Sequence, residues 1–335
     1  MSVRNKILII GPAWVGDMMM AQVLFRLLRQ HNPACEIHVL APAWSEALLS
    51  RMPEVNKSIV LPVGHGQLQL AKRYQFAKQL RAEKYDQAIV LPNSFKSALI
   101  PYWAAIPVRT GWLGECRFGL LNDIRYLNKK IFPKMVERFA ALAFARDMMI
   151  PANCPTPTLC INHKNTDVAL QKHNLKTDKL ILALCPGAEF GPSKCWPAEY
   201  YAAVANQKLS EGWQVWLFGS ANDVIIAEAI QQHTQQKCVN LSGKTSLSDA
   251  VDLLSLVNYV VTNDSGLMHI AAALNRNVIA IYGSTSPDFT PPLSDRAKII
   301  KLNLDCQPCF QRQCPLKHHN CMKQLRLERV LREMA

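Results

Sequence analysis

Several features that would place a chain in a familiar functional class are missing from this sequence. It has no G-x-G-x-x-G motif, so the glycine fingerprint of a dinucleotide-dependent oxidoreductase is absent. It has no Arg-Gly run and no basic helix that could follow a nucleic-acid backbone, which makes nucleic acid the weaker candidate for a partner. We find no internal repeat and no low-complexity segment.

Long apolar runs are also missing. The longest candidate, Ser97–Val108, is shorter than the roughly 18 residues that a membrane-spanning helix needs, and it contains two prolines. The first apolar run ends at Gly11-Pro12, which is too early for a signal peptide. We therefore expect a cytoplasmic protein.

The sequence is nevertheless long, apolar and basic. Its 335 residues, 49% of them hydrophobic, predict two domains. The formal net charge is +13, and residues 1–150 alone carry 20 Lys and Arg against 10 Asp and Glu. A protein this basic is expected to meet an anionic partner, such as a phosphorylated small molecule or a membrane surface, mainly through its N-terminal half.

Short β-branched runs alternate with amphipathic stretches in both halves, which is typical of parallel sheets covered by helices. The expected strands are Lys6–Ile10, Glu36–Leu40, Asp86–Leu91, Leu180–Cys185, Gln214–Phe218, Tyr259–Thr262 and Val278–Tyr282. The expected helices are near Asp17–Gln30, Gln67–Glu83, Pro133–Met149, Ala198–Ser210, Asp223–His233, Leu247–Leu254 and Gly266–Leu274. This pattern predicts an α/β fold with two Rossmann-like, doubly wound domains facing across a cleft. Such domains bind ligands beyond the carboxyl ends of their strands, so the functional residues are expected in those loops.

The domain boundary is expected in the proline-rich stretch Pro151–Thr158. The N-terminal domain would cover 1–155 and the C-terminal domain 156–320, with a cysteine-rich segment at 306–321. The end of the chain, 322–335, is expected to form a helix and is a candidate to pack back on the N-terminal domain.

The first strand leads into Gly11-Pro-Ala-Trp-Val-Gly-Asp17, where the acidic residue has two interpretations. An Asp at a strand-to-helix turn commonly caps the helix. It can also serve as a general base at the mouth of a cleft. The residues around it favour the cap.

In the second half, the glycine- and proline-rich loop that follows Leu184 contains Lys194 and leads into a helix near Pro197. Free backbone N–H groups, a lysine and a helix start together make a phosphate site, although an ordinary connection with a solvated lysine has the same composition. The segment Thr262-Asn-Asp-Ser-Gly-Leu-Met-His269 starts another helix after a strand. Two helix N-termini at the same sheet edge suggest a diphosphate.

Several collinear motifs resemble the ADP-heptose lipopolysaccharide heptosyltransferases, glycosyltransferase family 9. They are Gly16-Asp17, P-G-A-x-F-G-P-x-K-x-W-P ending at Pro197, T-N-D-S-G-L-M-H-I-A-A-A-L from Thr262, and Y-G-S-T-S-P-x-F-T-P-P from Tyr282. The stretches 92–98 (PNSFKSA) and 109–112 (RTGW) are most similar to the members that add the second heptose to the inner core.

The resemblance implies an inverting glycosyltransferase of the B architecture (GT-B), with the acceptor on the N-terminal domain and ADP-heptose on the C-terminal one. Asp17 would be the general base, and Lys194 with the helix start at 264–266 would stabilise the departing ADP. No divalent cation would be required for catalysis. The donor-binding residues that it implies are Gly187, Ser193, Gly219, Ser220, Asp223, Thr245, Asp264, Ser265, Gly266 and His269, with Asp223 at the ribose and the Thr245 backbone at the adenine; a lone histidine such as His269 is more often structural.

The acceptor that the resemblance implies is heptosyl-Kdo2-lipid A, whose carboxylates and phosphates would account for the basic N-terminal half. The residues expected to bind it are Asn93, Ser94, Lys96, Arg109 and Arg125. Lys134 and Arg138 are further candidates that could equally be a solvated helix face. The lipid end implies peripheral docking on the cytoplasmic face of the inner membrane of a Gram-negative bacterium.

Near the end, Cys306-x2-Cys309-x4-Cys314-x6-Cys321 has the spacing of a small thiolate metal knuckle, with zinc or iron as the candidate metal in a structural role. Reduced or disulfide-bonded thiols are the alternative. The remaining seven cysteines are scattered, as in a reducing compartment.

Two other functions remain open from the residues. One is the family member that adds the first heptose directly to Kdo. The other is a nucleotide-sugar-binding protein without catalysis, which the presence of both Asp17 and Lys194 disfavours. A nicotinamide-dependent oxidoreductase is disfavoured by the missing glycine fingerprint.

Overall fold

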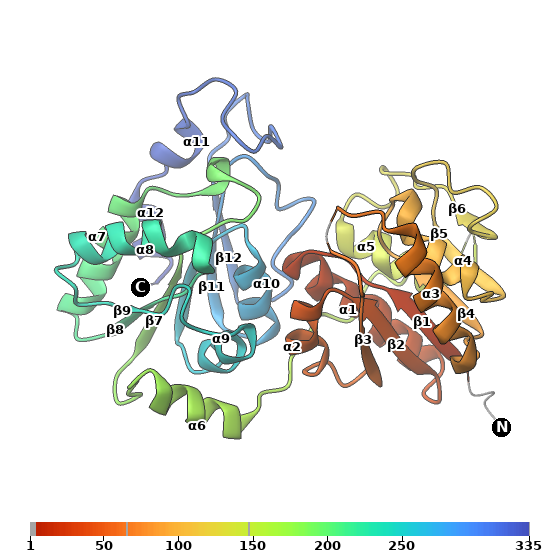
Figure 1. Cartoon of the computed structure of the whole chain (residues 1–335). Coiled ribbons are helices and arrows are strands. Elements are labelled where there is room, and N and C mark those ends of the chain that lie inside the picture. Colours follow the sequence, from red (N-terminus) through yellow and green to blue (C-terminus); the bar gives the residue numbers. More distant parts are fainter. Residues whose placement is uncertain (1–4, 65, 147, 335) are drawn as a thin grey trace. The chain divides into compact units, whose positions relative to one another are not determined.

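The computed structural model describes residues 5–64, 66–146 and 148–334. The chain divides into two compact units, Met1–Cys160 and Ile161–Ala335, coloured red to yellow and green to blue in Figure 1. Each unit is a six-stranded, fully parallel sheet covered by helices. The predicted fold class, two doubly wound α/β units, is confirmed.

The sheet of the first unit has the order β3-β2-β1-β4-β5-β6. The three predicted strands are present, and three further strands were missed because they are short and lie toward the sheet edges, where apolar residues are fewer. The strands are β1 (Lys6–Ile10), β2 (Glu36–Ala41), β3 (Lys57–Val60), β4 (Gln87–Val90), β5 (Val108–Trp112) and β6 (Asp123–Arg125).

The first helix of this unit, α1, packs on the sheet and is buried without interruption from Met18 to Phe25. The helix predicted over 133–149 is shorter than expected. The helices are α1 (Val15–His31), α2 (Glu46–Leu49), α3 (Leu70–Leu80), α4 (Leu99–Trp103) and α5 (Met135–Ala140), with short 3₁₀ turns at Ala43–Ser45, Arg81–Glu83, Phe95–Ser97 and Ala141–Ala143.

The sheet of the second unit has the order β12-β11-β10-β7-β8-β9. Its inner strands are almost fully buried, as expected for a parallel sheet with both faces covered. The strands are β7 (Ile181–Cys185), β8 (Gln214–Leu217), β9 (Val239–Asn240), β10 (Tyr259–Asn263), β11 (Asn277–Tyr282) and β12 (Ala297–Lys301).

The helices of the second unit include the predicted ones and a first helix, α6, that the sequence analysis did not name. They are α6 (His163–Lys172), α7 (Ala198–Ser210), α8 (Val224–His233), α9 (Leu247–Leu254), α10 (Gly266–Ala273), α11 (Asn320–Lys323) and α12 (Leu327–Arg332), with 3₁₀ turns at Pro192–Lys194 and Ala221–Asp223.

The last helix belongs to the second unit. Helix α12 packs on α7, and its Val330 lies in the same buried cluster as Trp196. The indole Nε1 of Trp196 donates to the Leu325 carbonyl over 2.8 Å, which fixes the approach to α12. These contacts place 322–334 with the C-terminal domain, where the sequence analysis had considered the N-terminal one.

The proline-rich stretch is attached to the first unit rather than free between the two. The fully buried Gln22 on α1 donates to the Thr158 carbonyl over 2.7 Å and accepts from the Thr158 amide over 2.9 Å. The Cys160 amide donates to the Arg51 carbonyl over 2.9 Å. The boundary therefore falls after Cys160, five residues beyond the expected one at 155.

Both sheets reverse their strand order at a point between two central strands, β1 and β4 in the first and β7 and β10 in the second. The crossovers on the two sides of such a point lead away from each other, which leaves a crevice at the carboxyl ends of the strands for a ligand. The loops after these four strands carry Asp17, the stretch 92–98, Lys194 and Asp264.

Candidate active site

The site of the second unit is built around an ion pair between two loops at the switch point. Lys194 closes the 3₁₀ turn after β7, and Asp264 follows β10. The Lys194 Nζ lies 2.7 Å from Asp264 Oδ2 and 3.2 Å from the Asp264 carbonyl oxygen. Both side chains are largely buried, at 14% and 5% exposure, so this pair is shielded from water and joins loops 70 residues apart.

A third loop, after β11, completes this arrangement. The Thr285 hydroxyl donates to Asp264 Oδ2 over 2.6 Å, so the carboxylate is held from two sides. Lys194 and Thr285 thus contact the same carboxylate oxygen of Asp264, which fixes the position of the Lys194 Nζ. Thr285 was not predicted as a site residue, although the Y-G-S-T-S motif contains it.

Helix α10 starts at this point with Gly266, and its N-cap is Ser265. The Ser265 side chain makes no capping bond to the helix, and its hydroxyl lies 3.2 Å from that of Thr262. The first backbone N–H groups of α10 carry the positive end of the helix dipole. Lys194 and this helix start bring positive charge to the same point, an arrangement that is chemically suited to an anion.

Asn263, which precedes Asp264, was overlooked as a site residue and is fully buried. Its side-chain oxygen accepts from the Trp196 amide over 3.1 Å and from the Tyr201 hydroxyl over 3.0 Å, while its Nδ2 donates to the Pro186 carbonyl. Asn263 thereby fixes both ends of the loop that carries Lys194. Its place in the T-N-D-S-G motif was the available signal.

The predicted ribose-binding residue, Asp223, lies between the loops after β7 and β8. Its Oδ2 accepts from the amide and the hydroxyl of Ser220 over 2.7 and 2.8 Å. A side chain on Gly187 would clash with the Asp223 carboxylate, and a Cβ on Gly219 would stand 2.7 Å from the Asp223 Cβ. Both glycines are thus required for this carboxylate to reach its position.

His269 lies one turn into α10 and is 6% exposed. Burial lowers its pKa from 6.5 to about 4; the Asp264 carboxylate opposes this shift and Lys194 adds to it. The imidazole is therefore neutral near pH 7 and contributes no positive charge.

The two remaining donor-site candidates differ in exposure. Thr245 follows β9 in a bend and is half-buried, at the same sheet edge as Asp223. Ser193 is 2% exposed, and its hydroxyl lies 2.9 Å from that of Ser284. Its amide donates to the Arg312 carbonyl over 3.2 Å. Ser193 is thus bound to the cysteine-rich segment and joins that segment to the Lys194 loop.

In the first unit, Asp17 is the third residue of α1, directly after the carboxyl end of β1, and is half-buried. It is not the N-cap, which is Trp14. Asp17 therefore does not cap α1. Its carboxylate lies in the first turn of the helix, at the switch point of the sheet.

Three predicted acceptor residues, Asn93, Ser94 and Lys96, lie together in the loop after β4, beside the β1 loop in the sheet. This loop is held by Arg117, whose guanidinium is fully buried. Arg117 donates to the Pro92 carbonyl over 2.7 Å, to the Ser97 hydroxyl over 3.3 Å and to the Trp112 carbonyl. Burial lowers its pKa to about 10, opposed by Glu115, so it stays charged near pH 7. Sequence analysis missed Arg117 because nothing in its local pattern marks it as buried.

The structure does not bring Arg109 to these residues. Arg109 is the second residue of β5, at the amino end of the strand, and its guanidinium donates to the carbonyls of Leu120 and Ile106 over 2.6 Å each. Arg125 ends β6 at the carboxyl edge, but its Nε and Nη2 are paired with Asp123 over 2.8 and 2.7 Å.

Lys134 and Arg138 take part in local helix contacts. Lys134 is the N-cap of α5, where its amide donates to Glu137 Oε2 over 2.9 Å and its Nζ lies 3.8 Å from Glu137 Oε1. Arg138 Nε donates to the Phe132 carbonyl over 3.0 Å. These contacts agree with the structural interpretation of both residues.

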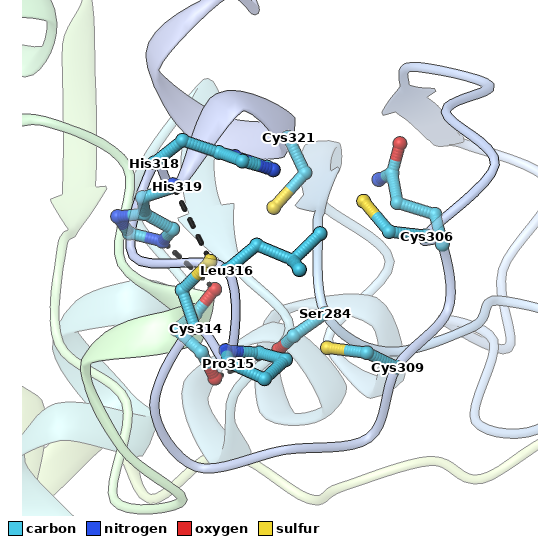
Figure 2. Close-up of a pocket in the computed structure, with 11 residues that line it drawn as sticks. Ser284, Cys306, Cys309, Cys314, Pro315, Leu316, His318, His319 and Cys321 are labelled. Atoms are coloured by element: carbon cyan, nitrogen blue, oxygen red, sulfur yellow. Dashed lines mark hydrogen bonds between the residues drawn. The ribbon is translucent and has the colours of Figure 1, made fainter.

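The four clustered cysteines line one small pocket together with Leu316, His318 and His319 (Figure 2). Within residues 5–64, 66–146 and 148–334, no three His, Cys, Asp or Glu side chains form a ready metal-binding group. The same part of the chain contains no helix long and apolar enough to cross a membrane.

Comparisons with known proteins show the family of the chain. The family model for glycosyltransferase family 9 (heptosyltransferase) matches residues 73–320. The chain is 47% identical to lipopolysaccharide heptosyltransferase 2 of Escherichia coli K12, over 98% of this chain and 97% of that protein. It is 52% identical to lipooligosaccharide heptosyltransferase 2 of Haemophilus influenzae, over 88% of each chain.

A solved structure supports the same relationship. The structure of E. coli ADP-heptose lipopolysaccharide heptosyltransferase II superposes with a TM-score of 0.89 at 45% sequence identity. The match covers 98% of this chain and 97% of that one, so the similarity includes both units.

Proposed function

The chain belongs to glycosyltransferase family 9 and is a heptosyltransferase of lipopolysaccharide core biosynthesis; from this premise we propose that it transfers L-glycero-D-manno-heptose from ADP-heptose to the first heptose of heptosyl-Kdo2-lipid A, with inversion. The motifs in the sequence had indicated the same family. The second-heptose assignment is favoured by the relatives named heptosyltransferase 2.

The observation that carries the donor assignment is the Lys194–Asp264 pair at the start of α10. When the bond between the anomeric carbon and the phosphate oxygen breaks, negative charge grows on the departing ADP. Lys194 and the N–H groups of α10 lie in one largely buried corner and would stabilise that charge more in the transition state than in the ground state. This positive charge supports catalysis without a divalent cation.

Asp17 is proposed as the general base. Its carboxylate would take the proton from the attacking acceptor hydroxyl as the new glycosidic bond forms on the face opposite the departing ADP. Its place in the first turn of α1 supports this role because the helix dipole favours the ionised form. An ionised carboxylate is the state that a base needs.

The rest of ADP would extend along the same sheet edge. The Asp223 carboxylate, held over Gly187, is proposed to meet the ribose hydroxyls, and the backbone at Thr245 the adenine. The loops after β7, β8 and β9 carry these residues in the order in which the strands lie in the sheet.

The acceptor is proposed to bind the first unit through Asn93, Ser94 and Lys96. Lys96 provides positive charge for Kdo carboxylates, and the surplus of basic residues in 1–150 would attract the phosphates of lipid A. Arg125 would bind the acceptor only if its ion pair with Asp123 opened. Arg109 lies at the amino end of β5, away from the carboxyl ends of the strands.

The surplus of basic residues in 1–150 is also proposed to dock the protein on the cytoplasmic face of the inner membrane of a Gram-negative bacterium. Each Lys or Arg near an anionic surface contributes about 1 kcal/mol. Sedimentation with vesicles tests this: the protein should bind vesicles containing anionic lipid, lose binding at high salt, and ignore neutral vesicles. Equal binding to both kinds of vesicle would contradict an electrostatic surface.

The acceptor assignment is tested by offering ADP-heptose with Kdo2-lipid A or with heptosyl-Kdo2-lipid A. We expect transfer only to the second. Faster transfer to Kdo2-lipid A would assign the first-heptose reaction instead, and hydrolysis of ADP-heptose without transfer to either would overturn the acceptor class.

The base is tested with Asp17→Asn, which should keep the affinity for ADP while kcat falls by at least about 100-fold, because general base catalysis contributes factors of this size. Glu46→Gln is the matched control, since Glu46 is also a first-turn carboxylate of the same unit. Activity of Asp17→Asn within tenfold of the wild type would refute the assignment.

A further inference from the structure

The cysteine-rich segment forms a second candidate site, separate from the groups used for transfer. Cys306, Cys309, Cys314 and Cys321 all line one cavity of about 20 Å³. In Figure 2 these four side chains lie around the same space, with Leu316 among them. A cavity of this size has room for one water molecule or one ion.

All eleven cysteines of the chain are free thiols, and these four line the same pocket. Their spacing, two, four and six residues between successive cysteines, lets a short chain wrap around a single centre. Four thiols and an ion-sized space are the requirements of a closed tetrahedral site. From this convergence we propose that Cys306, Cys309, Cys314 and Cys321 bind one divalent transition-metal ion, zinc or iron, as thiolates.

The two histidines at the pocket already have other partners. His319 Nε2 lies 3.1 Å from the Ser193 carbonyl oxygen, to which it donates. His318 Nδ1 accepts from the Asn320 amide over 3.0 Å. One ring nitrogen of each histidine is thus used to fix the surrounding backbone, and the proposed ligand set is the four sulfurs, which complete a tetrahedral site without either imidazole.

In the described residues the sulfurs line the cavity without standing at the mutual distances of a metal centre. Binding therefore requires them to move inward. Cys306, Cys309 and Cys314 lie in residues 302–319, which are all described and form neither helix nor strand, so their movement breaks no regular hydrogen-bond ladder. Cys321 is held on α11 and would be the fixed ligand toward which the other three move. Leu316 has to leave the space between the sulfurs.

The charged residues of the segment would balance the negative charge of a metal–thiolate centre. Four thiols that bind one M²⁺ release four protons and leave a centre of charge −2. Between 305 and 323 the chain carries Arg312, Lys317 and Lys323 against the single acidic residue Asp305. This local positive excess offsets the charge of the thiolate centre.

A metal would also account for the order of an otherwise irregular segment. The segment is attached at three points to the loops after β11 and β7: the Phe310 amide donates to the Ser284 carbonyl over 2.7 Å, Gln307 Nε2 to the Gly283 carbonyl over 3.0 Å, and the Ser193 amide to the Arg312 carbonyl over 3.2 Å. A structural centre of this kind stabilises a chain that has little core of its own.

The test is elemental analysis of the full-length protein, purified with reductant and without chelator. We expect about one equivalent of zinc or iron in the wild type and in the control Cys116→Ser, whose thiol is exposed in the first unit, and less than about a tenth in Cys309→Ser/Cys314→Ser. Cobalt(II) added to the metal-free protein should give the thiolate charge-transfer bands and strong ligand-field bands of a tetrahedral centre.

Alkylation of the native wild type avoids any folding defect of the variant. The four cysteines should react with iodoacetamide slowly before chelation and rapidly afterwards, whereas Cys116 should react at the same rate in both. Less than about half an equivalent of metal in the wild type, an unchanged metal content in the double variant, or a disulfide in peptide 306–321 would overturn the proposal.

Discussion

The burial of His269 predicts a pH dependence of stability that one substitution should remove. A histidine whose pKa is lower in the folded state binds its proton more tightly when the chain is unfolded. The folded state of this protein is therefore fully favoured, with respect to His269, above the unfolded pKa of 6.5, and it loses this contribution as the pH falls toward the folded value of about 4.

The magnitude follows from the shift. One pKa unit corresponds to about 1.4 kcal/mol, so lowering the pKa from 6.5 to about 4 corresponds in full to about 3 kcal/mol. Between pH 7.5 and pH 5, about 2 kcal/mol of this would be lost, since at pH 5 the unfolded histidine is protonated and the folded one is not.

The assay is urea unfolding at these two pH values, followed by tryptophan fluorescence. The free energy of unfolding of the wild type should fall by about 2 kcal/mol more than that of His269→Gln, because other titrating groups are common to both. His163→Gln, which removes an exposed histidine of the same unit, should follow the wild type. An equal loss in His269→Gln and the wild type would refute the reasoning that burial keeps this ring neutral beside the donor site.

Three further predictions concern the loops around the two substrate sites. Lys194→Met should raise the Kd for ADP by at least about tenfold in calorimetry, whereas Lys172→Met, which breaks the 3.1 Å ion pair with Asp249, should leave it unchanged; equal effects would exclude a specific phosphate contact. Arg117→Met should lower the Tm and raise the KM for the acceptor without changing the affinity for ADP, because Arg117 bonds the loop after β4 and the end of β5, both in the first unit; an unchanged acceptor KM would contradict this. Removal of the proposed metal should weaken ADP binding about two- to fivefold through Ser193, and remetallation should restore it; unchanged binding would separate the metal from the donor site.

Local sequence was sufficient for the central elements of both units. The predicted strands β1, β2, β4, β7, β8, β10 and β11 are all present, because each is a run of mainly apolar residues that both faces of a parallel sheet bury. Edge strands such as β3 and β6 were missed because one side of an edge strand faces solvent and its residues lose the apolar signature.

Side-chain partners could not be read from the sequence in the same way. Arg109 and Lys96 were both expected to bind the acceptor, since both are basic and near strand ends. The strand direction separates them: Lys96 follows the carboxyl end of β4, whereas Arg109 lies at the amino end of β5 and is used by backbone carbonyls. Which end of a strand a residue occupies depends on where the strand begins, and strand boundaries are the least certain part of a sequence-based prediction.

The sequence by itself determined the family, the two α/β units and the loops that hold Asp17, Lys194 and Asp264, because motifs and hydrophobic periodicity are properties of contiguous residues. Only the tertiary structure decided which residues of those loops contact one another. The order of parallel strands brings Lys194 to Asp264 across 70 residues, and the return of the chain to β11 brings four cysteines around one cavity beside Ser193. Long-range contacts of this kind depend on the crossovers between strands, which no local pattern of residues encodes.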